Sequence, residues 1–454
     1  MFVGRAKELE LLERQHHSRR FEFTTIYGRR RIGKTELIRQ HIKGKRALYY
    51  MALESNPETN LELLSRMVRQ ASGGGEAFTD YEGLFEGISK LADQERLVFV
   101  IDEYPYLTQA YPEISSLIQK FCDHRWKDGQ LHLILCGSTL DFPDQNVSGS
   151  SPLYGRRTAQ IRLKPFDFFE TQELLGSMAR EDVAVLYCAT GGVAEYLNYV
   201  DQSRSLETNL VNLFLTDSGR LYEEPMNFLK QELRESRVYN TILDAIARGA
   251  NKLGDIASKS HLPSRRLSRY LDHLMELCII SRETPMGNSA RKTLYRITDG
   301  SFRFWYRYVF PNMSAIEMGA GRRLYRSYIE KDLPNFMGEG FEKIFLDHFD
   351  RMNCRGELPV LVTQRSRWWG NNALEKREEE IDLIGRGGEL LIFAEVKWNR
   401  RRMDQTVIMD LIKKSLLIKG EEKYYVLFSK NGFTKKAVDY ARNKKHILLL
   451  TFLD

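Results

Sequence analysis

Three charged residues near the end of the chain have the types and spacing for metal-assisted chemistry on a phosphate. Asp382 precedes Glu395 by thirteen positions, and Lys397 follows Glu395 by two. Mg²⁺ prefers carboxylate oxygens, and bound Mg²⁺ activates water and offsets negative charge that develops on a phosphate. Residues two apart in a strand point to one face, so Lys397 can orient or deprotonate the water beside Glu395. An ordinary exposed hairpin is the alternative, since Glu and Lys are common residues.

The elements around these residues predict how they are positioned. Residues 378–402 predict two strands joined by a turn at 385–388. An amphipathic helix over 336–349 precedes them and carries Glu342, and a basic helix over 404–418 follows. A charged pair in a buried strand is costly unless it is paired or bound to metal. The order of these elements therefore favours an active site that uses Mg²⁺ over an exposed hairpin.

A second set of residues, near the start of the chain, has the pattern of a phosphate-binding loop. The sequence GRRRIGKT at 28–35 follows a strand-like stretch and precedes a helical pattern over 36–42. Glycines let backbone N–H groups face phosphates, while Lys34 reaches the β- and γ-phosphates and Thr35 holds Mg²⁺. The expected ATP-binding residues of the loop are Gly28, Arg29, Arg30, Arg31, Ile32, Gly33, Lys34 and Thr35. Its three arginines are expected at the surface, facing nucleotide or a neighbouring subunit.

Two further apolar stretches complete the predicted nucleotide site. Residues 97–101 predict a buried parallel strand that ends at Asp102, where a carboxylate can join the Mg²⁺ shell. Glu103 is the candidate base that orients the attacking water. A second strand over 131–137 ends at Ser138, which either senses the γ-phosphate or caps a turn.

The N-terminal motifs resemble those of a known family. The stretches FVGR at 2–5, GRRRIGKTEL at 28–37, VIDEYPYL at 100–107, CGS at 136–138 and PLYGRR at 152–157 look like the archaeal-type ATPases. These proteins lie within the STAND branch of AAA+-like P-loop proteins, and the resemblance covers roughly residues 1–235. It implies that residues 2–5 lie near the adenine. It also implies that Arg156 or Arg157 is a γ-phosphate sensor or an inter-subunit arginine. The stretch 190–197 looks like the family's lid motif, with Ala194 where proline is usual.

The middle of the chain predicts a winged helix. Three helical patterns over 238–249, 252–261 and 264–277 are followed by a strand, a loop and a strand. Ser264 is the expected N-cap of the third helix. Arg265, Arg266 and Arg269 then open a recognition helix that contacts DNA, unless the domain only packs against its neighbours.

An aromatic stretch, SFRFWYRYVF, follows at 301–310. Arginines interleave with its rings, so stacking on single-stranded bases is one interpretation. Burial within a linking helix or strand is the favoured one.

The C-terminal motifs resemble a second family. The stretches GEGFEKIF at 338–345, RWWG at 367–370, EEEIDLIG at 378–385 and FAEVKW at 393–398 are similar to the PD-(D/E)xK nuclease-like domain often fused to archaeal-type ATPases. The resemblance covers roughly residues 318–440. It implies metal ligation by Glu342, which fits the pattern better than Glu339, and by Asp382 and Glu395. It implies catalysis by Asp382, Glu395 and Lys397.

Composition limits the class of protein. Charged residues make up 28% and hydrophobic residues 42% of 454 residues, which is typical of a globular chain of several domains. The first residues contain no apolar signal region, no apolar run is long enough to cross a bilayer, and the five cysteines are scattered. These features predict a cytoplasmic protein without a membrane partner. The stretch 396–454 holds 14 Lys and Arg against 6 Asp and Glu, a net charge of +8 that suggests phosphate-containing partners.

These observations predict an α/β protein of several parts. We expect a P-loop ATPase domain with a helical lid over 1–235 and a winged helix over 236–300. An aromatic-rich linker over 301–330 and an α/β nuclease-like domain over 331–454 complete the chain. The predicted function is ATP hydrolysis that gates assembly or DNA engagement, with DNA cleavage at the C-terminus. Two alternatives stay open: a nucleotide-switched DNA-binding protein whose C-terminal domain is not catalytic, and a signalling ATPase that forms a homo-oligomer with ATP.

Overall fold

The computed structural model describes residues 2–138, 151–286, 293–372, 375–420 and 422–453. The chain divides into two compact units, Met1–Phe166 with Val193–Glu195, and Asp167–Gly192 with Tyr196–Asp454. Each unit has its own sheet and core. The predicted boundaries near residues 235, 300 and 330 fall inside the second unit, so these domain limits remain predictions.

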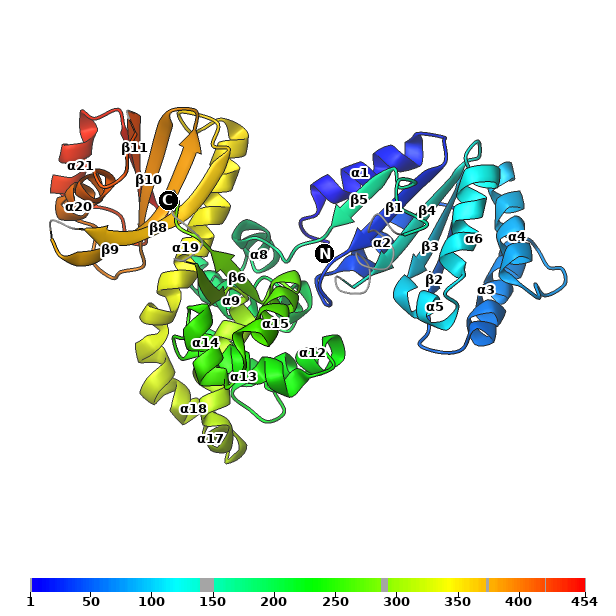
Figure 1. Cartoon of the computed structure of the whole chain (residues 1–454), viewed down its shortest axis with the longest axis horizontal. Helices are drawn as coiled ribbons and strands as arrows, with labels where there is room; N and C mark the ends of the chain where they lie inside the picture. Colours follow the sequence, from blue (N-terminus) through cyan, green and yellow to red (C-terminus); the bar gives the residue numbers. More distant parts are fainter. Residues whose placement is uncertain (1, 139–150, 287–292, 373–374, 421, 454) are drawn as a thin grey trace. The chain divides into compact units, whose positions relative to one another are not determined.

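The first unit is built on a sheet of five parallel strands in the order β2-β3-β4-β1-β5 (Figure 1). Its strands are β1 Glu22–Tyr27, β2 Ala47–Met51, β3 Leu97–Asp102, β4 Leu131–Gly137 and β5 Ala159–Arg162. β3 and β4 are buried along their whole length, as expected for strands covered on both faces. The α/β class predicted for this part is confirmed.

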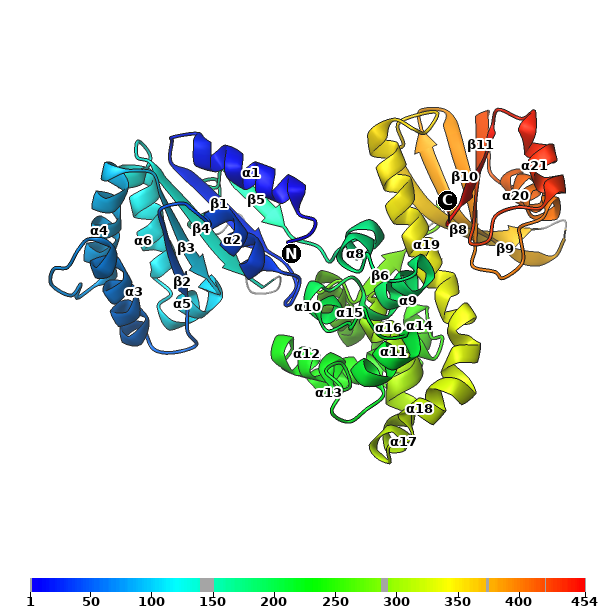
Figure 2. The ribbon, with the colours of Figure 1, turned by 180° about the vertical axis from the view of Figure 1, so that it is seen from behind.

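Helices cover both faces of this sheet, because the side chains of each strand alternate between two cores. In β3, Phe99 and Ile101 belong to one core, and Val98 and Val100 belong to the other. The second core contains α1 Ala6–His17 and α2 Lys34–Ile42, which lie in front of the sheet in Figure 2. The first core contains α3 Pro57–Ala71, α4 Tyr81–Gln94, α5 Tyr104–Ala110, α6 Ile114–Phe121 and the π-helical turn η1 Cys122–Trp126.

The second unit begins with helices. Up to the first hairpin they are α8 Phe168–Leu174, α9 Arg180–Thr190, α10 Ala194–Asn198, α11 Leu206–Phe214, α12 Glu224–Glu232, α13 Ser236–Ala247, α14 Leu253–Ser260 and α15 Ser264–Glu276. The first two residues of α10 belong to the first unit. The strands β6 Ile280–Glu283 and β7 Leu294–Ile297 then pair antiparallel. The three predicted helices over 238–277 and the two strands after them are therefore present. The predicted N-cap is wrong by one position, because Pro263 occupies the cap and Ser264 is already helical.

The aromatic stretch is helical and buried. It forms α16 Gly300–Phe304 and the π-helical turn η3 Trp305–Val309, and Phe302, Trp305 and Tyr308 are fully enclosed. This confirms the packing interpretation of the rings. The chain continues through η4 Phe310–Asn312, α17 Met313–Glu317, α18 Gly321–Leu324 and η5 Tyr325–Ile329 into the long helix α19 Glu330–Arg355.

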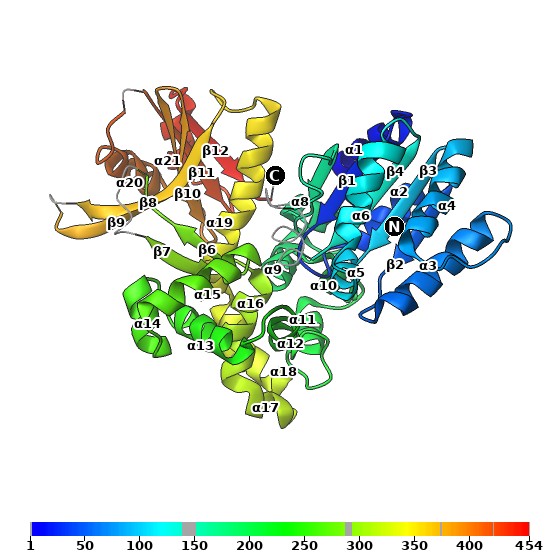
Figure 3. The same cartoon turned by 45° about the vertical axis from the view of Figure 1, so that its right-hand side comes forward.

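A mixed five-stranded sheet in the order β12-β11-β10-β9-β8 forms the last part of the second unit. Its elements are β8 Gln364–Asn372, β9 Arg377–Gly387, β10 Leu390–Lys397, α20 Gln405–Ser415, β11 Glu422–Ser429, α21 Lys435–Arg442 and β12 Ile447–Thr451. Figure 3 shows α19 on one face and α20 with α21 on the other. Phe341 and Phe345 of α19 pack on Phe428, with ring centroids 4.7 and 5.3 Å apart. Among the described residues, no helix is long and apolar enough to cross a membrane.

Candidate functional site

The predicted phosphate-binding loop joins the end of β1 to the start of α2. Gly33 has φ +92° and Arg31 has φ 69°, both in the left-handed region. A Cβ on Gly28 would lie 2.5 Å from the carbonyl oxygen of Leu163, so only glycine fits there. The first N–H groups of α2 have no partners within the helix and therefore face the loop. This geometry suits a phosphate group.

The residues of this loop and of β3 fit ATP and Mg²⁺. The Lys34 ammonium is buried and donates to the carbonyls of Gly28 and Arg29, at 2.9 and 3.1 Å. The Thr35 hydroxyl donates to Asp102 Oδ2 at 2.8 Å. A lysine held on the loop backbone, next to a hydroxyl and carboxylate oxygen pair, is a donor set that suits a nucleotide phosphate and a hard cation.

Glu103 and Ser138 follow adjacent parallel strands, at the end where the loop lies. Glu103 has φ 51°, and its backbone N–H donates to Asp102 Oδ1 at 3.0 Å. Ser138 is buried directly after β4. The structure thus brings Glu103 to the same edge of the sheet as Asp102 and Lys34. Its role as the base, and the role of Ser138, remain predictions.

The loop arginines differ in exposure from the prediction. Arg29 is 5% exposed, so its expected position at the surface is wrong. The loop turns inward at this residue, where the Arg29 carbonyl accepts from Lys34. Arg30 and Arg31 are half-buried, and Arg30 Nη2 donates to the Tyr106 hydroxyl at 3.2 Å.

The stretch predicted as a lid motif reaches the phosphate-binding loop. The backbone N–H of Glu195 donates to the Arg31 carbonyl at 3.1 Å, and the two side chains form an ion pair at 3.7 Å. A Cβ on Gly33 would lie 3.8 Å from Cβ of Ala194. A segment about 160 residues away in sequence is therefore in contact with the loop.

The two candidate γ-phosphate arginines have protein partners. Arg156 forms a two-pronged ion pair with Asp123, with Nε to Oδ1 at 2.7 Å and Nη2 to Oδ2 at 2.8 Å. This pairing lowers the pKa of Asp123. Arg157 Nη1 donates to Gln160 Oε1 at 2.6 Å. Contact of either arginine with nucleotide stays a prediction.

In the second unit, β9 and β10 bring the predicted C-terminal site residues together. Glu395 is 5% exposed, and Lys397 Nζ lies 2.5 Å from its Oε1. The other oxygen, Oε2, is buried and has no hydrogen-bond partner among the described residues; Lys414 Nζ of α20 lies 3.8 Å from it. A buried carboxylate oxygen without a hydrogen bond is costly and is a position where a cation fits.

Asp382 is tied to the backbone of the neighbouring strand. Its Oδ2 accepts a hydrogen bond from the N–H of Val396, at 2.7 Å. Burial raises the pKa of Asp382, and the negative charge of Glu395 raises it further, whereas Lys397 lowers it. The two carboxylates therefore repel each other inside the fold, and a cation placed between them would relieve this repulsion.

Glu342 of α19 is engaged elsewhere. Arg367 Nη1 donates to Glu342 Oε2 at 2.6 Å, and Arg367 also pairs with Glu380. Burial raises the pKa of Glu342, Arg367 lowers it, and the charge of Asp382 raises it. Within the described ranges, no group of three or more His, Cys, Asp or Glu side chains is placed to hold a metal ion. The structure thus brings Asp382 and Glu395 together but does not add Glu342 as a third ligand.

Comparisons with known proteins agree with the N-terminal site. A family model of an ATPase domain predominantly from Archaea matches residues 2–200, and a model of archaeal and bacterial proteins of unknown function matches residues 305–408. An uncharacterized protein of Methanocaldococcus jannaschii is 34% identical over 458 residues, covering 97% of this chain and 98% of that protein. The chain contains an archaeal-type ATPase domain and belongs to the same family as this M. jannaschii protein. The ATPase domain binds ATP.

Two further relatives support the ATPase domain. An uncharacterized ATP-binding protein of the same organism is 46% identical over 46 residues, which are 10% of this chain and 78% of that protein. A Walker-type ATPase of Pyrococcus abyssi has a similar structure, with a TM-score of 0.51 and 20% identity. It covers 67% of this chain and 96% of that protein, and at this identity it indicates a shared fold alone.

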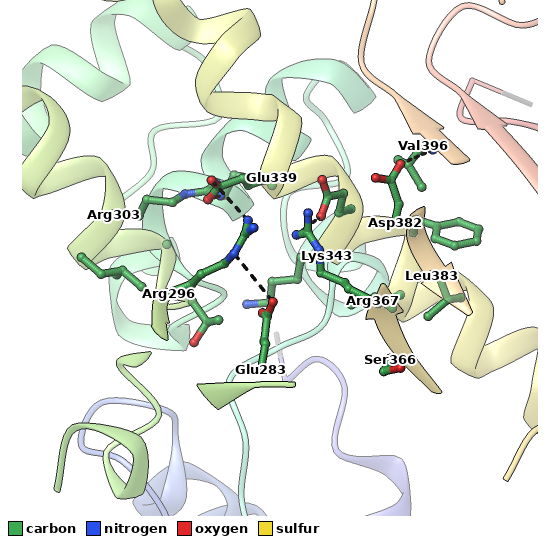
Figure 4. A pocket seen from close by; sticks show the side chains of 18 of the residues that line it. Glu283, Arg296, Arg303, Glu339, Lys343, Ser366, Arg367, Asp382, Leu383 and Val396 are labelled. Carbon is green, nitrogen blue, oxygen red and sulfur yellow. Dashed lines mark hydrogen bonds and ion pairs between the residues drawn. The ribbon is translucent and has the colours of Figure 1, made fainter. Parts of the chain in front are cut away.

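This archaeal-type ATPase also has a cavity that sequence patterns did not predict. The cavity lies in the second unit and is bounded by the β6–β7 hairpin, α16, α19 and the strands that carry Asp382 (Figure 4). Arg296 of β7 and Arg367 of β8 line it. Arg296 pairs with Glu283 of the same hairpin, but its other acidic partners, Glu339 and Glu380, come from distant stretches that no local spacing could have identified. The density of arginine over 282–303 was the only available signal.

Proposed function

We propose that this archaeal-type ATPase cuts DNA with its C-terminal domain, using Mg²⁺, and that the ATP state gates its assembly or its engagement of DNA. The observation that carries the proposal is the pair of carboxylates, half-buried Asp382 and buried Glu395, held on adjacent strands beside Lys397. Carboxylates grouped in this way destabilise a domain unless a cation neutralises them. Such costly groupings are common at catalytic sites.

The residues fit a hard divalent cation. Asp382 and Glu395 would hold it, and the Oε2 atom of Glu395 has no other hydrogen-bond partner among the described residues. When bound, Mg²⁺ supplies an activated water and offsets charge on the phosphate. Glu342 would act from further away, because Arg367 already binds its carboxylate.

Lys397 has a separate task in this proposal. Its ammonium lies on the same strand face as Glu395 and is 2.5 Å from that carboxylate. About two-fifths of its side chain is exposed, so it can contact a phosphate that arrives from solvent. There it would orient the attacking water and stabilise the negative charge that develops on the phosphate.

The ATP site would act through a different set of residues. Lys34 and Thr35 would hold the phosphates and the cation, Asp102 would complete the cation's shell, and Glu103 would orient the water for hydrolysis. Arg156 would sense the γ-phosphate only after release from Asp123. The contact of Glu195 with the loop residue Arg31 supports a lid that responds to nucleotide.

The predicted winged helix would supply part of the DNA contact. Arg265, Arg266 and Arg269 lie on α15 and are all exposed. They make one basic face at the start of the helix, which suits contact with DNA phosphates.

One observation favours the alternative, a nucleotide-switched DNA-binding protein with a C-terminal domain that is not catalytic. Two of the three acidic residues of the site have a cationic partner, since Arg367 pairs with Glu342 and Lys397 with Glu395, while Asp382 accepts from the backbone N–H of Val396. Protein charges alone could thus hold this site in a recognition or packing role.

A cleavage assay separates these two functions. The full chain is incubated with supercoiled plasmid and with single-stranded DNA, in Mg²⁺, Mn²⁺ or EDTA, with and without ATP. The proposal predicts metal-dependent cutting that Glu395→Gln abolishes, while ATP hydrolysis by this variant stays at the wild-type rate. DNA binding without cutting in any metal would support the alternative instead.

A further inference from the structure

The cavity beside Asp382 has the size of a pocket for a small group. Its volume is about 500 Å³, within the range of pockets that enclose small ligands. The major groove of duplex DNA alone is about 12 Å wide. The cavity is therefore too small for a duplex but large enough for part of one strand.

The lining of the cavity has a net positive charge. Six Arg and Lys residues line it against four Asp and Glu residues, an excess of two positive charges. Arg296, Arg303 and Arg367 each have a buried Nε without a hydrogen-bond partner in the described part of the chain. These guanidinium groups therefore retain donors that a phosphate oxygen could satisfy.

The acids that hold these arginines differ in exposure. Glu283, 3.7 Å from Arg296, and Glu342, 2.6 Å from Arg367, are mostly covered. Arg296 lies 3.9 Å from Glu339 and 3.7 Å from Glu380, whose side chains are about half exposed. Arg303 lies 3.3 Å from Glu339 (Figure 4). Exposed ion pairs of this length contribute little to stability. A phosphate that enters the cavity can therefore replace Glu339 and Glu380 beside Arg296 at a small cost, while Arg367 keeps its ion pair with Glu342.

The opposite side of the cavity carries the proposed cutting site. Asp382, Leu383 and Val396 line this side, and Figure 4 shows them apart from the group formed by Glu283, Arg296 and Glu339. The β6–β7 hairpin and the strands β9 and β10 thus face one space. A strand bound to the arginines would bring the next phosphate toward Asp382.

We propose that this cavity binds single-stranded DNA, with Arg296 and Arg367 contacting its backbone phosphates and the β6–β7 hairpin serving as one wall of the substrate site. The inference rests on the proposed DNA-cutting function for what happens at Asp382, but the binding itself does not require cutting. It names single-stranded ends or gaps as the substrate class. It also makes the wing of the predicted winged helix part of the cutting site.

Binding of a labelled single strand of about ten nucleotides, measured by fluorescence anisotropy in EDTA, tests this inference without cleavage. Arg296→Gln should weaken binding about tenfold. It should also reduce the slope of log affinity against log salt by about 0.7, the value for one lost phosphate contact. Arg323→Gln removes an exposed arginine of α18 outside the cavity and is the matched control, which should bind as wild type does.

A cross-linking measurement locates the strand directly. A strand that contains 4-thiothymidine, irradiated on the full chain, should attach to peptides from the β6–β7 hairpin or from β8. Attachment only to α15, or wild-type affinity of Arg296→Gln for the single strand, would overturn the inference. Melting temperatures of the variants exclude loss of fold as the cause of weaker binding, and Arg296→Lys should restore part of the affinity.

The outcomes distinguish this inference from the proposed function. If wild type binds the strand through Arg296 but never cuts it, the cutting function fails and the binding site stands. If wild type cuts DNA and Arg296→Gln cuts single strands equally well, the cutting function stands and the binding site fails.

Discussion

The Asp382 carboxylate accepts a hydrogen bond from the backbone N–H of Val396, the residue between Glu395 and Lys397, at 2.7 Å. This bond fixes the acid of β9 against the strand that carries the other two groups. It uses Oδ2, one of the two oxygens of the carboxylate. Asp382 therefore contributes both a hydrogen bond and a negative charge, and a substitution that keeps the hydrogen bond but removes the charge can separate these two effects.

Asp382→Asn should keep the fold and raise the melting temperature slightly in EDTA. The amide oxygen can still accept from Val396, while the repulsion with the Glu395 carboxylate disappears. Thermal unfolding of wild type and variant in EDTA measures this effect. Asp382→Ala also loses the hydrogen bond and should melt below Asp382→Asn. A lower melting temperature for Asp382→Asn than for wild type would mean that its charge is stabilising.

Lys397→Ala should slow cleavage by about a hundredfold or more, because the developing charge on the phosphate loses its nearest cation. Mn²⁺ affinity, measured by calorimetry, should change little, since the carboxylates remain. Stability should fall by about 1–2 kcal/mol, less than for a fully buried pair, because Lys397 is partly exposed and Lys414 still faces Glu395. Cleavage at the wild-type rate would remove Lys397 from the mechanism.

The ATP site should respond independently of the C-terminal site. Lys34→Ala should lose nucleotide binding, and Glu103→Gln should bind ATP but hydrolyse it about a hundredfold more slowly. Phosphate release and fluorescent-nucleotide binding measure the two steps. Asp382→Asn is the control and should hydrolyse ATP as wild type does. Hydrolysis at full rate by Glu103→Gln would show that another group orients the water.

The first unit should lose stability in mild acid. His41 is fully buried, and burial together with the charge of Lys45 lowers its pKa to about 4. The pKa of His132, also buried, is lowered in the same direction. Because the unfolded chain binds these protons first, stability is complete above pH ~6.5 and declines as the pH falls toward about 4.

Urea unfolding between pH 7.5 and 4.5 measures this loss. Each histidine that stays neutral in the fold contributes a slope of about 1.4 kcal/mol per pH unit. His41→Gln keeps a donor for Glu13 and should have a flatter slope. An equal slope in wild type and His41→Gln would contradict the assignment to His41.

Arg265→Ala combined with Arg266→Ala should weaken duplex binding and reduce its salt dependence, if α15 contacts phosphates. The two arginines are exposed, so the double variant should fold normally. Unchanged duplex affinity in the double variant would indicate that α15 packs against its neighbours and does not contact DNA.

The sequence predicted the elements that local patterns determine. The strand, loop and helix around Lys34, and the hairpin that carries Asp382 and Glu395, follow from apolar runs and glycine positions. Contacts between distant stretches did not follow. The pairing of Glu342 with Arg367 and of Arg156 with Asp123 depends on how helices and strands pack. The burial of Arg29 depends on the inward turn of the loop, which a residue type alone does not indicate.

The cavity was unpredictable for the same reason. Its walls come from the β6–β7 hairpin and from strands about 90 residues later, and only the folded second unit brings Arg296 near Glu380. The partner of a charged residue cannot be predicted from sequence when that partner comes from a distant element, because it depends on how the elements pack.

The most direct test of the proposed function compares DNA cleavage by wild type and Asp382→Asn in the same Mn²⁺ concentration. Asp439→Asn, which removes an exposed carboxylate on α21, is the matched control. We predict cutting by wild type and by Asp439→Asn, no cutting by Asp382→Asn, and no cutting by any of them in EDTA. Equal cutting by wild type and Asp382→Asn, or no cutting by wild type in Mg²⁺ or Mn²⁺, would contradict the proposal that Asp382 and Glu395 form a metal-dependent nuclease site.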